Sequence, residues 1–304
     1  MKENTLFYAL GGGLGHLTRI LALLNETMEL PRSARVLASS NLVSLVKPLQ
    51  PCPVDVVPPE VMSSRKQYYD FLKNYLFEFQ FKSIVLDTFP WGIVGEWSAM
   101  APTIPRILLA RYLNWQVYIR KFPCPGKTVP HHVLTLETLD RDYLSFLRAR
   151  AEVTALEQPI ILNYTEIQTD LPEQALKDNW LVVHSGPDHE QQTLIALAKE
   201  NMRKNGHNPK LLNTVFPHQE LFPVQKLICS VKHVVSGTGY NLVALASQAP
   251  PRRNHYFYPF PRLFDDQALR LQRFKTGLWQ QKKGSGNGRA AQWLLDTLAD
   301  LSPA

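Results

Sequence analysis

The residues best suited to chemistry stand near the start of the chain, in the stretch "GGGLGHLTR" at 11–19. It lies between two apolar runs, "TLFYAL" and "ILALL", which predict a strand and a helix. Glycines at such a junction let backbone N–H groups approach a phosphate, and the N-terminus of the helix favours an anion. The imidazole of His16 can exchange a proton near neutral pH. We therefore expect a ligand site here, with His16 either a general base toward a hydroxyl or a capping residue.

The glycine turn departs from the fingerprint of dinucleotide-binding proteins. That fingerprint is Gly-x-Gly-x-x-Gly, and Gly11 and Gly13 fit it, but the third position is His16. The second predicted strand should end in an acidic residue that binds the ribose, whereas this chain has Ser39 and Ser40 there. An enzyme that depends on a nicotinamide cofactor is therefore the least favoured interpretation, and no cofactor is expected.

Composition limits the class of protein. The chain has 304 residues, of which 45% are hydrophobic and 19% charged, as in a globular protein of one large or two ordinary domains. No apolar run reaches the roughly 18 residues of a membrane span, and the first residues do not resemble a signal peptide. Cys52, Cys124 and Cys229 are too far apart for a disulfide framework or a zinc site. These features predict a reduced, cytoplasmic protein without a bound metal.

The charge balance narrows the choice of ligand. The net charge is +7, but the basic residues are scattered apart from short pairs such as Arg252–Arg253 and Lys282–Lys283. The sequence contains no recognition motif for DNA or RNA, so a nucleic-acid partner is not expected. A small anionic ligand is the simpler explanation, and peripheral association with the inner face of a membrane is left open.

The elements that must position these residues alternate along the first half of the chain. Helices are predicted at 16–28 and 64–81, and strands at 5–10, 34–39, 54–58, 82–90 and 104–111. Strands that alternate with helices indicate βαβ units, in which helices cover both faces of a parallel sheet. We therefore expect an α/β domain whose ligands bind at the carboxyl ends of the strands.

The same alternation of strands and helices is predicted again in the second half of the chain. A strand, a Gly-Pro turn and a helix are predicted within 179–204, then strands at 208–216 and 231–239 and a helix at 240–247. We expect two Rossmann-like domains, 1–165 and 166–287, with the boundary in the polar stretch 161–179. The last apolar helix, 288–301, needs a partner surface and is expected to return to the N-terminal domain.

Four motifs in order resemble those of known sugar enzymes. The stretch "GGGLGHLTR" resembles the N-terminal motif of the N-acetylglucosaminyltransferase that makes lipid II, and of the UDP-sugar hydrolase of pseudaminic acid synthesis. The stretch "VLDTFPWGIVGE" is similar to a mid-domain segment of bacterial predicted glycosyltransferases. "SGTGYNLVALA" and "FPRLFDDQALRLQRF" look like their nucleotide-sugar site. The resemblance spans nearly the whole chain and implies the GT-B fold, in which two Rossmann-like domains face a cleft and the C-terminal one holds the donor.

The resemblance also implies roles for particular residues. His16 would be the catalytic base, and Asp87, which ends a predicted strand, would hold His16 or an acceptor hydroxyl, unless it only forms a turn. In the family an Asp-Gln pair contacts the donor sugar, although Asp265 and Asp266 could instead only cap a helix. The expected donor and phosphate contacts are Gly12, Gly13, Ser185, Gly186, Gly237, Thr238, Gly239, Tyr240, Asn241, Asp265, Asp266 and Gln267.

One departure from the family matters. A Glu that grips the ribose hydroxyls usually follows the Gly-Tyr-Asn motif, and here the candidate positions hold Ala244 and Leu245. Each hydrogen bond lost to a charged group would cost about 1.5–3 kcal/mol. Either another residue substitutes, the donor differs, or transfer activity has been lost. Arg252 and Arg253 add positive charge nearby that suits phosphate.

The favoured function is that of an inverting, metal-independent glycosyltransferase of the hexosyltransferase type. It would move a sugar from a nucleotide-diphosphate donor, expected to be UDP-linked, to an acceptor hydroxyl that the sequence does not identify. A hydrolase or epimerase of the same fold, with water as the acceptor in the case of the hydrolase, is the first alternative. A non-catalytic protein that binds a nucleotide sugar is the second.

Overall fold

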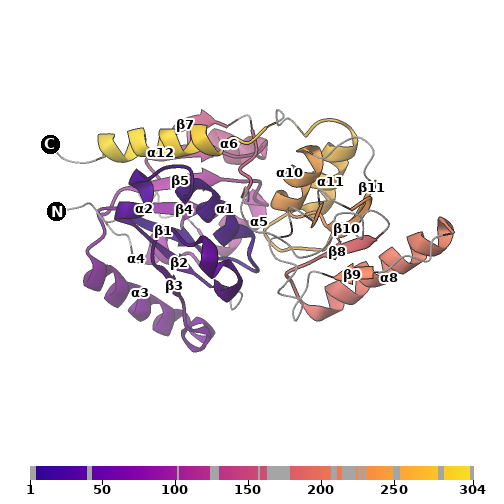
Figure 1. The fold of residues 1–304 in the computed structure, drawn as a ribbon. Coiled ribbons are helices and arrows are strands. Elements are labelled where there is room, and N and C mark those ends of the chain that lie inside the picture. The colour runs from indigo at the N-terminus through magenta and orange to yellow at the C-terminus, as the bar shows by residue number, and fades with distance from the viewer. Residues whose placement is uncertain are drawn as a thin grey trace. The chain divides into compact units, whose positions relative to one another are not determined.

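The computed structural model describes most of the chain (Figure 1). The described residues are 5–39, 43–100, 103–123, 130–156, 158–162, 179–206, 211–213, 224, 227–228, 231–248, 254–279 and 284–301. The chain divides into two compact units. The first comprises Met1–Ile160, Leu263–Asp266 and Gln280–Ala304, and the second comprises Ile161–Arg262 and Gln267–Trp279.

The first unit is built on a seven-stranded parallel sheet. Its order is β3-β2-β1-β4-β5-β6-β7. The strands are β1 (Thr5–Ala9), β2 (Ala34–Ala38), β3 (Val54–Val56), β4 (Ser83–Asp87), β5 (Arg106–Ala110), β6 (His132–Thr135) and β7 (Glu152–Ala155). The helices are α1 (Gly15–Leu24), α2 (Glu29–Ser33), α3 (Arg65–Phe79), α4 (Glu96–Met100), α5 (Trp115–Lys121), α6 (Arg141–Arg148) and α12 (Asn287–Asp300), with short 3-10 helices at Val43–Leu49 and Pro59–Ser63.

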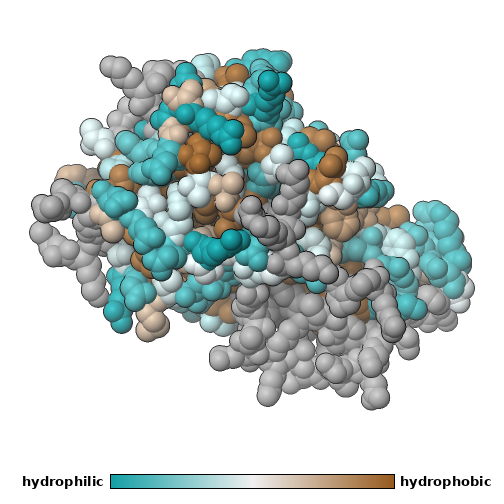
Figure 2. Space-filling model, turned by 90° about the horizontal axis from the view of Figure 1, so that it is seen from above, coloured by the Kyte–Doolittle hydropathy of each residue, from teal (hydrophilic) through white to brown (hydrophobic). Residues whose placement is uncertain are grey.

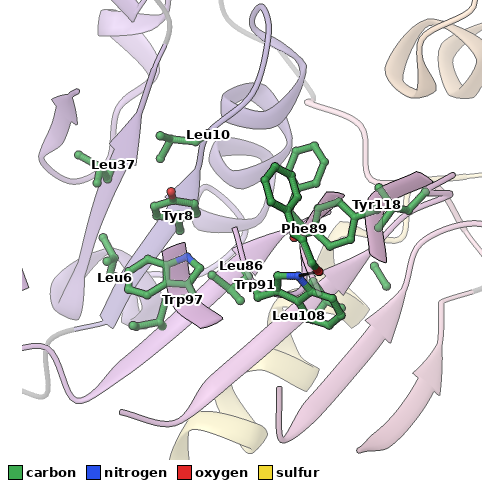
Figure 3. Close-up of a cluster of buried hydrophobic side chains, with 14 of the residues drawn as sticks. Leu6, Tyr8, Leu10, Leu37, Leu86, Phe89, Trp91, Trp97, Leu108 and Tyr118 are labelled. Carbon is green, nitrogen blue, oxygen red and sulfur yellow. Dashed lines mark hydrogen bonds between the residues drawn. The ribbon is translucent and has the colours of Figure 1, made fainter. Parts of the chain in front are cut away.

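The core of the first unit follows from the period of two along its central strands. Alternate residues such as Leu6 and Tyr8 of β1 and Leu86 of β4 point into one aromatic-rich cluster with Trp91 and Trp97 (Figure 3). Side chains of α3, α5 and α6 belong to the same cluster. The strands β1, β4 and β5 are buried along their whole length, as expected for parallel strands covered on both faces.

The final helix α12 packs on α1 and α2 of the first unit. Asn287, at its start, donates a side-chain hydrogen bond of 2.9 Å to Glu26, and the N–H of Gly286 bonds the carbonyl of Pro159 at 2.8 Å. Ala290, Ala291 and Leu294 are completely buried, so the apolar stripe of this helix has its partner surface within the first unit.

The second unit carries a four-stranded parallel sheet of order β11-β10-β8-β9. The strands are β8 (Trp180–Val183), β9 (Leu211–Asn213), β10 (His233–Gly237) and β11 (Asn254–Tyr258), and the helices are α8 (Asp188–Lys204), α10 (Tyr240–Gln248) and α11 (Gln267–Lys275). Leu181 and Val234 pack into one apolar cluster, whereas Val182 and Val235 pack into another. Successive residues of one strand therefore serve opposite faces of this sheet.

The predicted α/β class with two parallel sheets is confirmed, and most predicted elements appear with shifted ends. The helix predicted at 16–28 ends at Leu24, because the side chain of Asn25 bonds the carbonyl of Leu21 at 2.8 Å. The strand predicted at 82–90 ends at Asp87, since Thr88 has a φ of +74° and turns the chain. No elements were predicted between residues 112 and 155, where α5, β6, α6 and β7 lie.

Several sequence features fall outside the described residues. These are Ser40, Cys124, Cys229, the Arg252–Arg253 and Lys282–Lys283 pairs, most of the expected boundary stretch 161–179, and the ends of the strand predicted at 208–216. Residues 263–266, which were expected in the second domain, belong to the first unit.

The surface is mixed in character. Figure 2 shows hydrophilic and hydrophobic residues interspersed over one face of the molecule. The most exposed large apolar side chains, Phe77 and Met28, stand on and beside different helices. Within the described ranges, every helix is too short or too polar to cross a membrane.

Candidate functional site

The carboxyl edge of the seven-stranded sheet gathers four ionisable side chains. His16 lies in the first turn of α1, directly after β1, and Asp87 is the last residue of β4. Arg111 follows β5, and Glu137 comes shortly after β6. Because β1, β4, β5 and β6 are neighbours in that order, these four residues form a row along the edge where parallel sheets bind ligands.

His16 and Asp87 form a close pair. Nδ1 of His16 lies 2.5 Å from Oδ2 of Asp87, whose side chain is completely buried, while 12% of the His16 side chain is exposed. The imidazole stacks on Phe89, with ring centroids 5.8 Å apart. With Nδ1 engaged by the carboxylate, Nε2 is the nitrogen that can accept a proton. This partnership is one of the three roles predicted for Asp87 from the sequence.

The glycine turn makes room for the imidazole. A Cβ on Gly11 would lie 2.2 Å from Nε2 and Cδ2 of His16, so only glycine fits there. Gly13 has a φ of +82°, which other residues rarely adopt. A Cβ on Gly12 would meet nothing within 4 Å, so this position borders open space. Gly11 and Gly13 are thus needed by the turn itself, whereas Gly12 is open to a ligand.

The surroundings favour neutral His16 beside ionised Asp87. Burial lowers the pKa of His16 below its ordinary value; Asp87 opposes this effect, while the charges of Arg19 and Arg111 add to it. Burial alone would raise the pKa of Asp87, but Arg19 and His16 hold it well below its usual range. The pair therefore combines an anionic carboxylate with an uncharged imidazole.

Arg19 is a member of this cluster that the sequence analysis missed. Its side chain is completely buried, with Nε 3.0 Å from Oδ1 and Nη2 2.5 Å from Oδ2 of Asp87. It stands three residues after His16 on α1, so both side chains leave the same face of the helix. That spacing was visible in the sequence, but the buried anion that makes it meaningful comes from β4. Thr88, with its strained φ, fixes the chain just after that anion.

Arg111 extends the row of charges. Its Nε lies 3.5 Å from Oε1 of Glu137 and its Nη2 lies 3.9 Å from Oδ2 of Asp265. Glu137 also accepts the N–H of Tyr112 at 2.9 Å. Asp265, expected among the donor contacts, thus faces a cation of the first unit.

The position of Asp265 is fixed by the aromatic residue that precedes it, Phe264. Phe264 packs edge-on against Phe89, the residue that stacks on His16, with ring centroids 6.0 Å apart. It also packs against Tyr118, which lies beside Phe89 in the core (Figure 3). The carbonyl of Phe264 accepts the N–H of Asn114 at 2.9 Å. These contacts seat residues 263–266 on the first unit next to the His16 cluster.

The motif residues Trp91 to Glu96 have a structural role. The buried carboxylate of Glu96 accepts the N–H groups of Ile93 and Val94 at 3.1 and 2.9 Å and the hydroxyl of Tyr8. A Cβ on Gly92, whose φ is +92°, would meet that carboxylate at 2.0 Å. The "WGIVGE" part of the second motif therefore wraps a loop around a buried acid.

In the second unit, Gln267 organises two loops. Its Oε1 accepts the backbone N–H of Thr238, at 3.2 Å, and that of Phe260, at 3.0 Å. The hydroxyl of Thr238 in turn donates to the carbonyl of Gln267 at 2.9 Å, and Arg270 bonds the Thr238 carbonyl at 3.2 Å. Thr238 is completely buried, so its N–H and hydroxyl serve these loops. The NH2 group of Gln267 is thereby oriented and left to donate.

The other residues expected near the donor differ in their surroundings. Gly239 has no atom within 4 Å of an added Cβ and is open. Tyr240 is buried, with its ring 5.9 Å from that of Trp279, whereas Asn241 is partly exposed. Ser185 is exposed in the turn between β8 and α8, and a Cβ on Gly186 would lie 2.7 Å from Nε2 of His184.

An ion pair between a buried glutamate and a partly exposed arginine beside this turn was not foreseen. Nη2 of Arg262 donates to Oε2 of Glu190 at 2.6 Å, and its Nη1 donates to Oε1. Nε2 of His184 lies 3.3 Å from the same Oε2. Burial alone would raise the pKa of Glu190, but Arg262 holds it below its ordinary value. The pair ties the first turn of α8 to the segment after β11.

The expected positions for a ribose-binding acid offer no substitute. Ala244 is completely buried, Leu245 packs in an apolar cluster, and α10 contains no acidic residue. Glu190 is a buried carboxylate in this unit, but Arg262 and His184 engage it. In the described part of the chain, no three His, Cys, Asp or Glu side chains lie close enough to hold a metal ion.

The expected site residues thus form two sets. His16, Asp87 and Asp265 lie in the first unit with the glycine turn, whereas Ser185, the 237–241 loop and Gln267 lie in the second. That both sets line one cleft stays a prediction.

Several solved structures similar to this chain are glycosyltransferases or UDP-GlcNAc 2-epimerases. No protein-family model and no curated protein matches the sequence. The chain is similar to spinosyn forosaminyltransferase SpnP, with 13% identity over 99% of this chain and 100% of that one and a TM-score of 0.54. It is likewise similar to the UDP-GlcNAc 2-epimerase from Neisseria meningitidis bound to UDP-GlcNAc, with 11% identity over 99% and 100% and a TM-score of 0.55.

A third similar structure is SsfS6, a glycosyltransferase from Streptomyces sp. SF2575. Its identity is 13% over 90% of this chain and 86% of that one, with a TM-score of 0.53. At these identities the likeness concerns the fold. This chain has the GT-B fold that glycosyltransferases and UDP-GlcNAc 2-epimerases share.

Proposed function

We propose that this chain is an inverting, metal-independent glycosyltransferase that uses a nucleotide-diphosphate sugar, UDP-linked, as its donor. The observation that carries the proposal is the His16–Asp87 pair at the carboxyl edge of the first sheet. A neutral imidazole held at Nδ1 by a buried carboxylate is what a general base toward a hydroxyl requires.

The chemistry follows from that pair. Nε2 of His16 takes the proton of the acceptor hydroxyl while the oxygen attacks the anomeric carbon from the face opposite the diphosphate. The bond from that carbon to the diphosphate breaks, and its electrons leave with the nucleotide. Asp87 stabilises the imidazolium that forms, as an anion at Nδ1 does in other His-dependent transfers. The loop at Gly237–Gly239, before the N-terminus of α10, would offer backbone dipoles to the developing negative charge of the diphosphate.

The donor would lie against the second unit. Gly239 and Ser185 border space that a diphosphate could enter. We propose that the oriented NH2 group of Gln267 donates a hydrogen bond to a hydroxyl of the sugar. This role agrees with the resemblance of residues 260–274 to the nucleotide-sugar site of predicted glycosyltransferases. Without an acid at position 244 or 245, ribose binding would depend on other groups.

A ligand screen tests the proposal. Thermal unfolding would be measured with UDP, GDP, dTDP and their sugars, where a ligand at 100 times its Kd adds about 2.7 kcal/mol. Stabilisation by one nucleotide sugar, followed by its consumption only when an acceptor is added, is the expected result. Consumption without an acceptor would favour a hydrolase or an epimerase, and the similar Neisseria meningitidis structure is a UDP-GlcNAc 2-epimerase. Binding with no turnover would favour a non-catalytic protein.

Gln267 permits a test that separates loop organisation from donor recognition. Gln267→Glu retains an acceptor for the two backbone N–H groups but removes the NH2 donor, so donor Kd should rise about tenfold with a modest change in stability. Gln267→Leu leaves both N–H groups unpaired and should also lower the free energy of unfolding, by about 1–3 kcal/mol per group. Calorimetric titration and urea unfolding of both variants measure the two effects. Unchanged donor affinity in Gln267→Glu would reduce Gln267 to a structural role.

The pH dependence of turnover follows from the lowered pKa of His16. The base must be neutral, so kcat/KM falls as pH drops through the pKa of His16 in the free enzyme. Because that pKa is below its ordinary value, we expect the acid limb to have its midpoint below about pH 6.5. Initial rates between pH 5 and 8, with stability checked at each pH, measure it. An acid limb above pH 7 would show that another group titrates.

A further inference from the structure

We propose that Arg19 is the positioning residue of the His16–Asp87 pair, compensating the charge of Asp87 and fixing its carboxylate so that His16 stays a neutral base. Only the role of His16 as a catalytic base rests on the proposed function. Independently of that function, Arg19 sets the protonation of His16.

The geometry leaves the carboxylate no freedom. Nε of Arg19 binds Oδ1 of Asp87 at 3.0 Å, and Nη2 binds Oδ2 at 2.5 Å. Oδ2 is also the atom that faces Nδ1 of His16 at 2.5 Å. The side chains of Arg19 and Asp87 are both completely buried, so water does not screen their interaction. One turn of α1 therefore presents a base and a cation to the same oxygen atom.

The charges that face His16 come from three elements. Asp87 at the end of β4 attracts a proton to the imidazole, whereas Arg19 on α1 and Arg111 after β5 repel it. Arg111 is itself paired with Glu137 and Asp265, so its field at the imidazole is partly offset. Phe89, on which the ring stacks, is apolar. An Asp87 without Arg19 would pair with an imidazolium, and the base would be protonated at higher pH.

The test follows the protonation of His16 directly. The nine histidines of the full chain would be labelled with 13C at Cε1 and titrated by NMR, and the His16 signal would be assigned from its loss in His16→Gln. We expect Arg19→Met to raise the titration midpoint of His16 by about one pH unit or more. Arg35→Met is the matched control, because Arg35 bonds Asp55 at 2.6 Å elsewhere in the same unit. It should leave the His16 midpoint unchanged.

Two further variants keep the test decisive if Arg19→Met does not fold. Arg19→Lys retains the charge and should keep the midpoint near that of the wild type. In a variant that already carries Asp87→Asn, adding Arg19→Met removes the positive charge of Arg19. The titration midpoint of His16 should therefore be higher in the double variant than in Asp87→Asn alone. A midpoint that stays within about 0.3 pH units of its reference, or that falls, in the folded Met variant would overturn the proposal.

The titration also separates this inference from the proposed function. The titration needs no substrate. A shifted midpoint in a protein that binds no nucleotide sugar would therefore support the role of Arg19 and contradict only the catalytic role of His16. Sugar transfer by the wild type together with an unmoved midpoint in Arg19→Met would leave the proposed function standing and remove the role of Arg19.

Discussion

His16→Ala should lower turnover by about 10²–10⁴-fold while the affinity for the donor changes little. The loss is expected because Nε2 of His16 is the proton acceptor of the proposed mechanism, and Nδ1 is already engaged by Asp87. Donor affinity should be preserved because Gly239, Ser185 and Gln267, against which we place the donor, stand in the second unit, whereas His16 belongs to the first. The effect should therefore appear in kcat, with little change in the Kd measured by calorimetry.

His132→Ala serves as the control for that experiment. His132 lies at the start of β6 in the same unit and faces Glu152 at 3.3 Å, away from the carboxyl edge of the sheet. It should keep wild-type turnover and donor affinity. Normal turnover in His16→Ala would return His16 to a packing role in the glycine turn.

Asp87→Ala should reduce the free energy of unfolding by about 3–5 kcal/mol, the usual loss when one partner of a buried ion pair is removed. The reason is that Arg19, completely buried, would keep its charge without the carboxylate that binds its Nε and Nη2. Of a typical total stability of about 5–15 kcal/mol, this is a large share. Urea unfolding followed by tryptophan fluorescence, with the m-value compared with that of the wild type, measures the loss.

Asp55→Ala provides the matched comparison. Asp55 also pairs with an arginine, Arg35, at 2.6 Å, but the two side chains are 36% and 27% exposed. Water solvates both charges, so losing this ion pair should cost about 1 kcal/mol or less, and losing the hydrogen bond from the Tyr75 hydroxyl to Asp55 should add about 1 kcal/mol. Equal losses of unfolding free energy in Asp55→Ala and Asp87→Ala would mean that the buried Arg19–Asp87 pair depends on its carboxylate no more than a surface pair does.

Sequence patterns predicted most of the frame that holds the candidate site. The apolar runs that became β1, β4 and β5 are buried along their whole length, and such strands can be recognised because a parallel sheet covered on both faces needs nearly continuous hydrophobic residues. The glycine turn could be located because its glycines stand between two apolar runs. The structure gives a reason for one of them, since only glycine fits against the imidazole at Gly11. Between residues 112 and 155 the strands have only four residues each, too few for a periodic pattern to stand out.

The chemistry within the site was less accessible to sequence reasoning. Arg19 stands in the same helix turn as His16, but its role depends on Asp87, which lies 68 residues further on and reaches it only through the order of the strands. Gln267 was expected to contact a sugar. In the structure its side-chain oxygen Oε1 also accepts hydrogen bonds from the loops after β10 and β11. The Arg262–Glu190 pair joins residues 72 positions apart and has no local pattern.

By itself, the sequence predicted most of the strands and helices outside residues 112–155, located the glycine turn, and singled out His16 as the residue most suited to proton transfer. These properties are local, because they follow from periodicity, from backbone conformation and from the chemistry of single side chains. Only the tertiary structure decided which charges meet: Arg19 and His16 on one carboxylate, and Arg111 beside Glu137 and Asp265. A buried charge needs a partner, and that partner is chosen by strand order and by packing rather than by distance along the chain.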